Sequence, residues 1–354
     1  MEKHSSQSLP PEQHTASAWN GPDMAQRKNE WVMQLTAADI AELEAAAKPL
    51  LASGQNIATL NPADFPLPGL APKLAALRNE LVLGRGFALL RGLPVAQYDE
   101  HMAGAIFYGL GRHLGLPRSQ NAKGHMLGHV RDLGLKSNDP NVRIYQTNER
   151  QTFHTDSTDV VGLLCLNKAK AGGASLLVSA SAIFNEMRVQ RPDLLDLLLQ
   201  PIATDRRGEV PEGMLPYLLI PVFSLYEDFL TVFYQRQYID SAQRFEDAPR
   251  LTPLHVEALD MFDRLANDPK LNLSMELEPG DMQFVYNHAL LHDRTGFEDW
   301  DDPAQKRHLL RLWLSIPGDR PLPAIFASRY GTIEIGNRGG IIVHGTTLTI
   351  PWTT

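Results

Sequence analysis

From about Arg143 onward, the apolar residues come in short runs rather than in the long amphipathic stretches that form helices. Runs of about four to eight such residues, bounded by Gly, Pro and polar residues, are typical of buried strands. In this part of the chain only two segments have a helical pattern. The runs lie at 160–166, 175–178, 229–234, 271–277, 282–286 and 309–316, and the expected helices at 192–199 and 252–268.

The part of the chain before Arg143 is expected to be mainly helical. Thr36 and Asp39 form a capping-box pattern before an Ala-rich segment, and further helices are expected up to about residue 83 and over 98–114. The glycine-bounded apolar segment 84–94 predicts one strand. The whole pattern predicts a mainly β chain with helical decoration, an α+β fold with a sandwich or jelly-roll core.

The first residues of the chain differ in composition from the rest. Residues 1–30 include a long stretch rich in Ser, Gln, Pro and His without periodicity, and we expect them to form a flexible N-terminal arm. Residues 31–354 are then expected to form a single domain.

Composition excludes several classes of partner. Hydrophobic residues make up 43% and charged residues 21%, as in soluble globular proteins, and no run reaches the roughly 18 apolar residues that span a bilayer. The net charge of −8 argues against nucleic-acid binding. The single cysteine, Cys165, and the polar start without a signal core favour the cytoplasm. A small-molecule partner is therefore expected, with no nucleic acid and no membrane.

A candidate metal site begins at the sequence Phe-His-Thr-Asp. In a strand, alternate side chains share a face, so His154 and Asp156 point the same way. His288 and His292 follow the apolar run 282–286, and either one completes a set of two histidines and one carboxylate. Such a set binds ferrous iron and leaves positions open for other ligands. The spacing alone does not choose between the two histidines.

A candidate anion site lies in the run 306–314. Strand alternation places Arg307 and Arg311 on one face, together with Leu309 and Trp313, and His308 on the other. A guanidinium on an apolar face needs an anion, although an edge strand with acidic partners is the plainer alternative. Ser175, which follows a Gly-Gly pair at the start of a strand, offers a hydroxyl.

In their order along the chain, these pieces resemble the taurine dioxygenase family of Fe(II)/2-oxoglutarate oxygenases, which includes the 2,4-dichlorophenoxyacetate dioxygenases and is related to clavaminate synthase. The resemblance covers about residues 81–314. It implies a double-stranded β-helix core, Fe(II) as the metal, and 2-oxoglutarate and O₂ as cosubstrates. It also implies that His154, Asp156 and His292 are the catalytic iron ligands, because the family's distal histidine lies in a Leu-His-x-Arg context.

The same resemblance implies roles for the anion-binding residues. Arg307 would bind the far carboxylate of 2-oxoglutarate, and Ser175 would contact that carboxylate. Arg311 matches an arginine that faces either the cosubstrate or an anionic substrate. The implied reaction is oxidation of a small organic molecule, by default hydroxylation, with release of succinate and CO₂. Members of the family are often oligomeric, so a homo-oligomer is expected.

The substrate is less constrained by the sequence. Tyr145 and Asn148 precede the first candidate ligand, and Arg236 lies in a polar and aromatic segment. Arg311 and Arg236 together favour an acidic or zwitterionic substrate, although a surface arginine with a local acidic partner would explain Arg236 equally well. The charged segment 205–213 is expected to be a mobile loop, either a lid or an ordinary surface loop.

Two other functions use the same candidate ligands. A zinc-dependent hydrolase or lyase would need His154, Asp156 and His292 but would leave Arg307 without a role. A non-catalytic β-sandwich with a structural metal would normally close its site with a fourth protein ligand. Both alternatives therefore explain less of the pattern than an oxygenase does.

Overall fold

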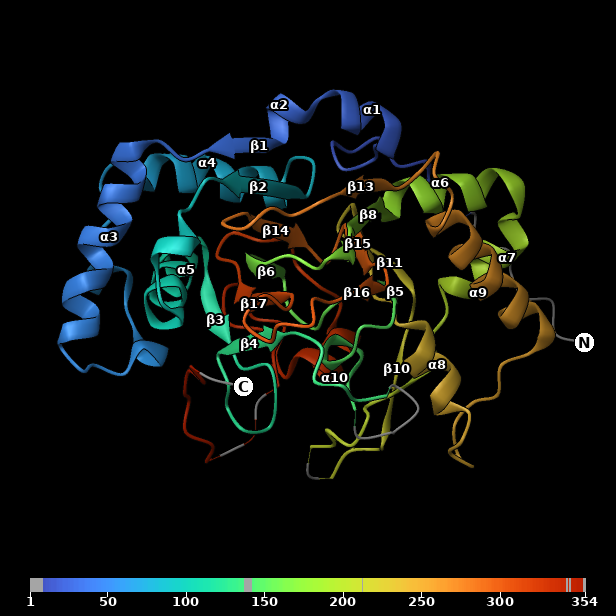
Figure 1. Ribbon diagram of the computed structural model, residues 1–354. Coiled ribbons are helices and arrows are strands. Elements are labelled where there is room, and N and C mark those ends of the chain that lie inside the picture. Colours follow the sequence, from blue (N-terminus) through green and yellow to red (C-terminus); the bar gives the residue numbers. More distant parts are fainter. Residues whose placement is uncertain (1–8, 137–141, 212, 342, 344, 353–354) are drawn as a thin grey trace, which may run out of the picture.

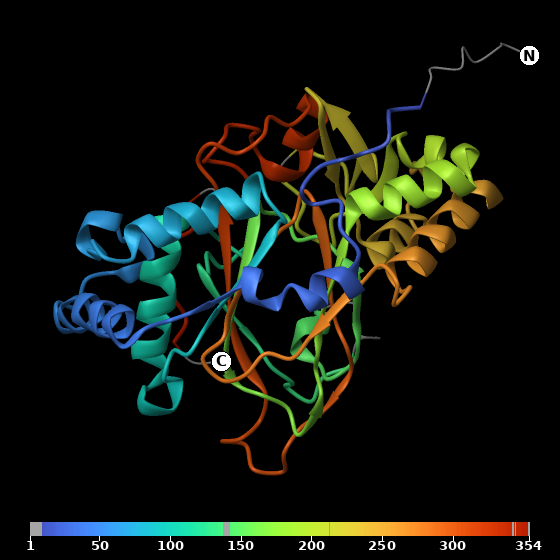
Figure 2. The same cartoon turned by 90° about the horizontal axis from the view of Figure 1, so that it is seen from above.

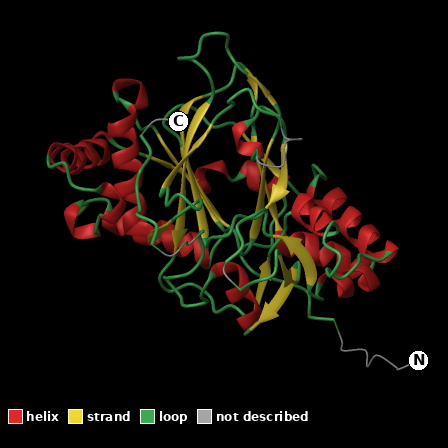
Figure 3. Cartoon of the chain, turned by 90° about the horizontal axis from the view of Figure 1, so that it is seen from below, coloured by secondary structure: helices red, strands yellow, loops and turns green. Residues whose placement is uncertain are grey.

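The computed structural model describes residues 9–136, 142–211, 213–341, 343 and 345–352. Two β-sheets face each other in the centre, and helices cover the outer side of each sheet. The layers are seen from above in Figure 2 and from below, coloured by secondary structure, in Figure 3. Helices and sheets are thus combined in the way expected for an α+β chain.

The larger sheet has the strand order β1-β2-β14-β6-β17-β3, and β4 also pairs with β17. Neighbouring strands are antiparallel except for β1 and β2. Nearly all residues of its central strands β14, β6 and β17 are buried, as the apolar runs predict. The bounds are β1 Val32–Gln34, β2 Phe87–Arg91, β3 Leu116–Arg118, β4 Leu127–Val130, β6 Val160–Asn167, β14 Met282–Tyr286 and β17 His308–Ser315.

The smaller sheet has the order β13-β8-β15-β5, and all of its pairs are antiparallel. It brings together four segments that are far apart in the sequence (Figure 1). Its strands are β5 Gln151–His154, β8 Ser175–Ser179, β13 Leu273–Met275 and β15 Leu290–Arg294. Three two-stranded ribbons complete the β structure: β7 Ala171–Gly172 with β16 Phe297–Glu298, β9 Ile202–Asp205 with β10 Tyr217–Ile220, and β11 Phe223–Tyr226 with β12 Phe229–Val232.

The first third of the chain is mainly helical, as expected, and two of its long helices, α4 and α5, pack on the larger sheet, while α3 packs on α5. Their bounds are α3 Ala37–Ala52, α4 Ala71–Val82 and α5 Glu100–Leu114. The capping box at Thr36 and Asp39 is present, because each side chain bonds the backbone N–H of the other residue. Phe107 on α5 contacts Phe284 on β14, so the helices and the sheet share one apolar core.

The helices after residue 179 are more numerous than predicted. The expected helices are present as α7 Pro192–Leu198 and α9 Pro253–Ala266, but α6 Ala180–Gln190 and α8 Arg236–Ala242 are additional. The α6 helix begins directly after β8, where the Ser179 side chain accepts a hydrogen bond from the Ala182 N–H. The strand passes into the helix without a Gly, Pro or loop between them, so the boundary is marked only by the Ser179 cap. A short α10 helix, Ala327–Tyr330, lies near the cavity described below.

The described part of the expected N-terminal arm, residues 9–30, lies against the body of the protein. It includes α1 Gly21–Gln26, and α2 follows at Lys28–Trp31. The Trp19 indole is buried and donates to the Arg85 carbonyl, while the Gly21 N–H donates to the Leu271 carbonyl. The sequence did not reveal this packing, because single contacts such as those of Trp19 and Gly21 in a polar segment produce no periodic pattern of apolar residues. No helix among the described residues is long and apolar enough to cross a membrane.

Candidate functional site

Two histidines and an aspartate meet between the two sheets. His154 on β5 and His292 on β15 are cross-strand partners, and their ring centroids lie 4.1 Å apart. Asp156 lies two residues beyond the end of β5, not within the strand as predicted, but its side chain still turns to the histidines. Its carboxylate oxygens lie 3.9 Å from His154 Nε2 and 3.7 Å from His292 Nε2. We call these three residues the open triad.

Neighbouring polar groups orient the open triad. His154 Nδ1 donates to the Thr152 carbonyl at 2.8 Å, which leaves Nε2 as the lone-pair atom facing Asp156. The Gln151 side-chain amide nitrogen lies 2.8 Å from that same Nε2, so it occupies the lone pair that a metal ion would take and has to turn away when one binds. The Trp313 indole N–H donates to Asp156 Oδ2 at 3.0 Å. Such outer contacts fix the tautomer and rotation of groups that ligate a metal.

The local electrostatics keep two of these groups in metal-binding protonation states. Burial, aided by the neighbouring His154, lowers the pKa of His292 to about 3, so its imidazole is neutral at physiological pH. Burial alone would raise the pKa of Asp156, but the charge of Arg311 and contacts with the histidines outweigh it and lower that pKa. Two imidazoles and a carboxylate whose ligand atoms lie within 4.8 Å of one another fit a divalent iron ion.

A second group of histidine and aspartates is closed. Asp159, His288 and Asp319 also approach one another, but Arg338 lies among them. Arg338 Nε donates to Asp159 Oδ1 at 2.8 Å and Nη2 to Asp319 Oδ2 at 2.7 Å, and His288 Nε2 lies 2.8 Å from Asp159 Oδ1. All four side chains are fully buried. We call these four residues the Arg338 cluster. Because His288 belongs to this cluster, the structure distinguishes it from His292 as a candidate ligand, which the sequence spacing alone does not do.

A third group lies on the far face of β17. His308 Nε2 is 2.8 Å from His129 Nδ1, and His129 Nε2 is 2.8 Å from the Pro351 carbonyl. His308 is therefore on the opposite face from Arg307 and Arg311, as strand alternation predicts. These histidines bond each other and the backbone and lie away from the open triad.

A narrow inner pocket adjoins the open triad and is lined by Ser175, His292, Arg307, Leu309 and Arg311 among others. Arg307 is only 5% exposed, and its Nη1 has no hydrogen-bond partner among the described residues. Burial lowers its pKa to about 10, so it remains a cation at neutral pH. Ser175 donates its hydroxyl to Gln283 Oε1 at 3.0 Å. A buried guanidinium with an unused donor fits an anionic ligand.

The Gly-Gly pair before Ser175 makes room for Arg307. A Cβ atom placed on Gly173 would lie 3.0 Å from Arg307 Nε, and the φ of Gly173 is +76°. Both the space and the left-handed backbone favour glycine at this position. The motif therefore has a steric reason that the sequence alone does not reveal.

Arg294 is a second cation in the inner pocket and was missed in the sequence. Its guanidinium lies 4.7 Å from the centroid of Phe297, over which Arg307 also lies at 5.1 Å. Arg294 donates to the backbone carbonyls of Thr147 and Glu149. Burial and the charge of Arg307 lower its pKa to about 9. It stands two residues after His292 on the same strand, so alternation could have placed it on the same face.

Arg311 lies at the boundary between the inner pocket and a wider outer cavity. Its Nε donates to Gln120 Oε1 at 2.7 Å. Its guanidinium carbon lies 4.5 Å from the centroid of Tyr145 and 5.1 Å from the Trp313 ring, which holds it between two aromatic faces. Arg311 is thus fixed in position beside Asp156.

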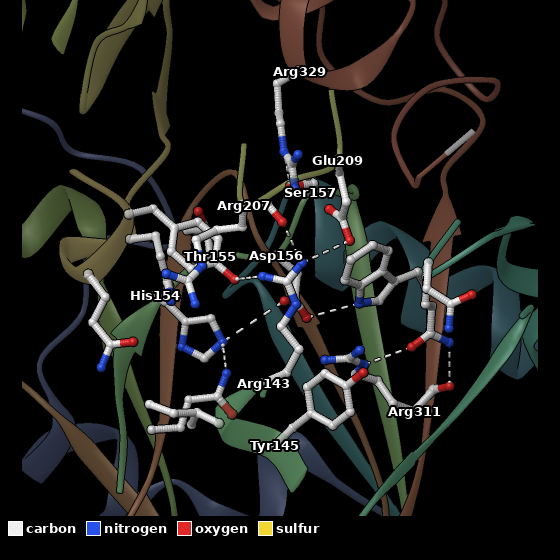
Figure 4. A pocket seen from close by; sticks show the side chains of 18 of the residues that line it. Arg143, Tyr145, His154, Thr155, Asp156, Ser157, Arg207, Glu209, Arg311 and Arg329 are labelled. Atoms are coloured by element: carbon white, nitrogen blue, oxygen red, sulfur yellow. Dashed lines mark hydrogen bonds and ion pairs between the residues drawn. The ribbon is translucent and has the colours of Figure 1, made fainter. Parts of the chain in front are cut away.

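The outer cavity is shown in Figure 4 and has a volume of about 140 Å³. Its described wall comes from both sheets, from the segment before β5, from the loop after β9 and from α10. Cationic side chains dominate it. The charged residues of the wall, apart from the open triad, are Arg143, Arg207, Glu209, Arg311 and Arg329.

The substrate residues suggested by the sequence are only partly brought together. Tyr145 lines both cavities, but Asn148 lines neither and instead accepts a backbone hydrogen bond from Phe297. Arg236 also lies outside the cavity walls, although Gln235 and Gln237 on either side of it are part of the outer wall. The contacts of Arg236 fit the alternative interpretation, a local acidic partner, because three carboxylates, those of Asp240, Asp260 and Asp263, hold its guanidinium.

The loop after β9 does reach the site. Arg207 and Glu209, which belong to the charged segment singled out in the sequence, line the outer cavity. Residue 212 of that segment lies outside the described residues. Arg143 and Arg329, which also line the cavity, gave no signal in the sequence because each is a single arginine without a patterned neighbour.

The sequence matches the family model described as "Taurine catabolism dioxygenase TauD, TfdA family" over residues 47–313. The FR-33289 synthase of Streptomyces rubellomurinus is 33% identical over 310 residues, which cover 86% of this chain and 91% of that protein. The taurine hydroxylase-like protein SAT17 of Stachybotrys chartarum is 30% identical over 322 residues, 88% of this chain and 82% of that protein. A uridine-5'-phosphate dioxygenase of an Amycolatopsis species is 31% identical over 177 residues, 47% of this chain and 62% of that protein.

Solved structures share the fold at lower sequence identity. Asparagine oxygenase in complex with Fe(II), 2S,3S-3-hydroxyasparagine and succinate has a TM-score of 0.59 and 18% identity, covering 80% of this chain and 93% of that one. The non-heme iron oxygenase OrfP in complex with Fe and alpha-ketoglutaric acid has a TM-score of 0.60 and 16% identity with the same coverage. At this identity the likeness shows the fold.

Proposed function

Because this chain belongs to the TauD, TfdA family and is thus an oxidoreductase of the non-haem iron, 2-oxoglutarate-dependent kind, we propose that it hydroxylates a small acidic or zwitterionic organic molecule. Succinate and CO₂ would be the coproducts. Two named relatives support a polar substrate: asparagine oxygenase carries a hydroxylated amino acid in its solved complex, and the uridine-5'-phosphate dioxygenase is named for a phosphate ester.

The open triad carries the proposal. His154, Asp156 and His292 would hold Fe(II), because their ligand atoms converge beside the inner pocket. The Arg338 cluster is closed by its cation, and His129 and His308 bond each other on the far face of β17. When bound, the iron supplies the activation of O₂, with 2-oxoglutarate as the source of electrons. The contribution of the protein is to orient these ligands, through Thr152 and Trp313, and to keep the site dry between two sheets.

The inner pocket would bind 2-oxoglutarate. Arg307, with its unused Nη1 and its place beside Ser175, would pair with the far carboxylate, and Arg294 would strengthen the positive potential there. Arg311 is aligned by Gln120 and two aromatic rings, so it would set the boundary between cosubstrate and substrate.

The proposal also covers the architecture and assembly. We assign the two facing sheets to the two halves of a double-stranded β-helix, and residues 31–354 to one catalytic domain. The homo-oligomeric state and the cytoplasmic location predicted from the sequence stay predictions.

The two alternatives account for less of the site. A zinc-dependent hydrolase or lyase would use the open triad but would leave two buried arginines, Arg294 and Arg307, beside it without a ligand. A non-catalytic metal-binding sandwich would not need a pocket next to its metal. The inner pocket therefore favours the oxygenase.

An anaerobic optical titration tests the proposal. The apo-protein is titrated with Fe(II) and 2-oxoglutarate, and the same is done for Arg307→Ala and for Arg264→Gln, which changes an exposed arginine on α9. We expect a visible charge-transfer band that needs both ligands, is kept in Arg264→Gln and is weakened in Arg307→Ala. Folded, iron-loaded protein that gives no band would refute the proposal.

A further inference from the structure

The described wall of the outer cavity is positively charged, whereas the whole chain is negatively charged. The chain has 33 Lys and Arg against 41 Asp and Glu. Outside the open triad, however, the described cavity wall has four arginines and a single carboxylate, that of Glu209. An acidic protein that gathers cations in one cavity concentrates anions there. The excess lies at the end away from the inner pocket, so it is not explained by 2-oxoglutarate.

Arg329 on α10 presents donors to this cavity. Its Nε donates to Ser157 Oγ, and within the described part of the chain its two Nη groups have no acceptor. Figure 4 shows the side chain pointing from above toward Ser157, one residue after Asp156. The helix that carries it is held by Arg206, which donates to the Ser328 carbonyl at 2.7 Å. The guanidinium is thus aimed by its surroundings and retains donors for a ligand.

The guanidinium group of Arg143 makes only long hydrogen bonds to the described part of the protein. Its contacts are 3.4 Å to the Tyr238 hydroxyl, 3.2 Å to the Arg207 carbonyl and 3.2 Å to Glu209 Oε1. These lengths are at the long end for N–H···O bonds, whose usual distance is about 2.9–3.0 Å. An anion with short contacts would replace them at little cost. The bond to the Arg207 carbonyl also places Arg143 beside the loop that carries the third arginine.

Arg207 is held at the same wall in a fixed backbone conformation. Its φ is +54°, a left-handed value, and the Arg207 N–H donates to Asp205 Oδ1 at 2.7 Å. Its guanidinium carbon lies 5.6 Å from the centroid of Tyr238. Arg143, Arg207 and Arg329 therefore approach the cavity from three separate segments, which suits a ligand group with several oxygens.

Counting charges gives the class of ligand. Among the described residues of the outer wall, three guanidinium groups, those of Arg143, Arg207 and Arg329, stand against one carboxylate, that of Glu209, with Arg311 assigned to the inner boundary. A carboxylate or sulfonate carries −1, whereas a phosphate monoester carries about −1.5 to −2 at neutral pH and offers three acceptor oxygens. The only outer carboxylate in the described wall is paired with Arg143, so the described wall offers no further carboxylate to a substrate ammonium.

We propose that the substrate bears a tetrahedral dianion, a phosphate or phosphonate group, which Arg143, Arg207 and Arg329 bind at the outer end of the cavity. The carbon to be oxidised then lies toward the open triad. This inference rests on the proposed function, because it names what is oxidised at that same site, and it narrows the acidic or zwitterionic class to the acidic one.

Calorimetric titration of the protein tests the anion class. The probes are propyl phosphate, propylphosphonate, propane-1-sulfonate and butyrate, each added to the anaerobic Fe(II)- and 2-oxoglutarate-loaded protein and to the metal-free protein. We expect at least one of the two dianions to bind about tenfold or more tightly than the two monoanions, since one further charge-assisted contact has that effect. The tighter of the two dianions tells whether the group is linked through oxygen or through carbon.

Matched variants connect this preference to the named residues. Arg329→Gln and Arg143→Gln are expected to weaken the binding of the preferred dianion about tenfold each, while Arg264→Gln leaves it unchanged. Glu209→Gln should instead tighten it severalfold, because the variant removes the competing carboxylate. A variant that merely damages the fold would not tighten binding. The visible band with Fe(II) and 2-oxoglutarate should be the same in all four.

Several results would overturn the inference. Equal affinity for dianions and monoanions would do so, as would unchanged affinity in Arg329→Gln and Arg143→Gln, or weaker binding in Glu209→Gln. The two proposals fail separately. A normal visible band without dianion preference removes only this inference, whereas dianion binding by metal-free protein that never gives the band supports this site and removes the oxygenase.

Discussion

Two clusters of histidine and aspartate lie almost side by side in the sequence but differ in what they can bind. Asp156 and Asp159 are three residues apart, and His288 and His292 are four apart. In the Arg338 cluster, both oxygens of Asp159 accept hydrogen bonds, from Arg338 and Ser315 among others. In the open triad, the imidazole nitrogens and the carboxylate face one another and a cavity. The comparison teaches that residue type alone does not mark a candidate metal site, because in the Arg338 cluster a buried cation already pairs with both carboxylates.

The two clusters also differ in what the protein gains from them. A buried ion pair brings little net stability compared with apolar packing, but removing one partner leaves a buried charge uncompensated. The ion pairs of the Arg338 cluster therefore hold the segment after β17 against the start of β6. The open triad keeps its polar atoms for a ligand. The predictions below separate these two roles.

The largest effect is expected from removing a ligand of the open triad. His292→Ala should lower turnover by more than about 100-fold, since losing even an outer partner of a metal ligand costs 10–100-fold. Its thermal unfolding should stay near that of the native protein. The matched change His288→Ala should instead lower the unfolding temperature. Succinate release and calorimetric melting measure the two outcomes, and an exchange of these phenotypes would reverse our assignment of the histidines.

The next effect is expected from removing the cation of the Arg338 cluster. Arg338→Met keeps the bulk but leaves Asp159 and Asp319 without their cation, and we expect a loss of about 3–5 kcal/mol in the free energy of unfolding. Urea denaturation measures it. Arg264→Gln, an exposed change, should stay within about 0.5 kcal/mol of the native protein. A loss below about 1 kcal/mol in Arg338→Met would mean that the cluster does not hold the segment in place.

A smaller effect is expected in the inner pocket, which extends the open triad. Arg307→Gln should weaken 2-oxoglutarate binding about 10–100-fold, because it removes a charge-assisted pair worth roughly 1.5–3 kcal/mol. Iron binding and unfolding free energy should be little changed. Calorimetry with 2-oxoglutarate on the loaded protein gives the affinity. If iron binding fell in parallel, Arg307 would be supporting the triad rather than the cosubstrate.

The smallest effect tests how the open triad is oriented. Trp313→Phe keeps an aromatic ring beside Arg311 but removes the indole N–H that donates to Asp156. We expect about a tenfold loss of iron affinity, at the low end for outer partners of a ligand. Chelator competition measures this loss. Trp31→Phe, a change at another buried tryptophan far from the triad, serves as the control and should not alter iron affinity.

The sequence revealed patterned elements and missed unpatterned ones. The apolar run 282–286 coincides with β14, and the capping box at Thr36 gives the start of α3 within one residue. Alternation placed Arg307 and Arg311 on one face, which the inner pocket confirms. The α6 helix was missed because it follows β8 directly, with the single cap residue Ser179 and no loop between them.

The residues of the candidate site also fall into two groups, those that a local sequence pattern revealed and those that it did not. His154 and Asp156 form a local pattern, but the choice of His292 over His288 needed either a family resemblance or the position of Arg338. The outer arginines were invisible because they lie on separate loops and meet only through tertiary structure; Arg143 and Arg207 are 64 residues apart. Residues grouped by the fold rather than by local spacing leave no signal in one sequence.

The position of Arg338 has a consequence for the order of events during synthesis. It is separated from its partner Asp159 by 179 residues. A ribosome adding about 5–20 residues per second needs about 9–36 s to cover that interval. The strands β15 and β17, which carry His292 and Arg311, are synthesised only toward its end. A nascent chain thus stays incomplete at its centre until late in translation, and a chaperone that shields the Asp159 region over those seconds would raise the yield of active protein.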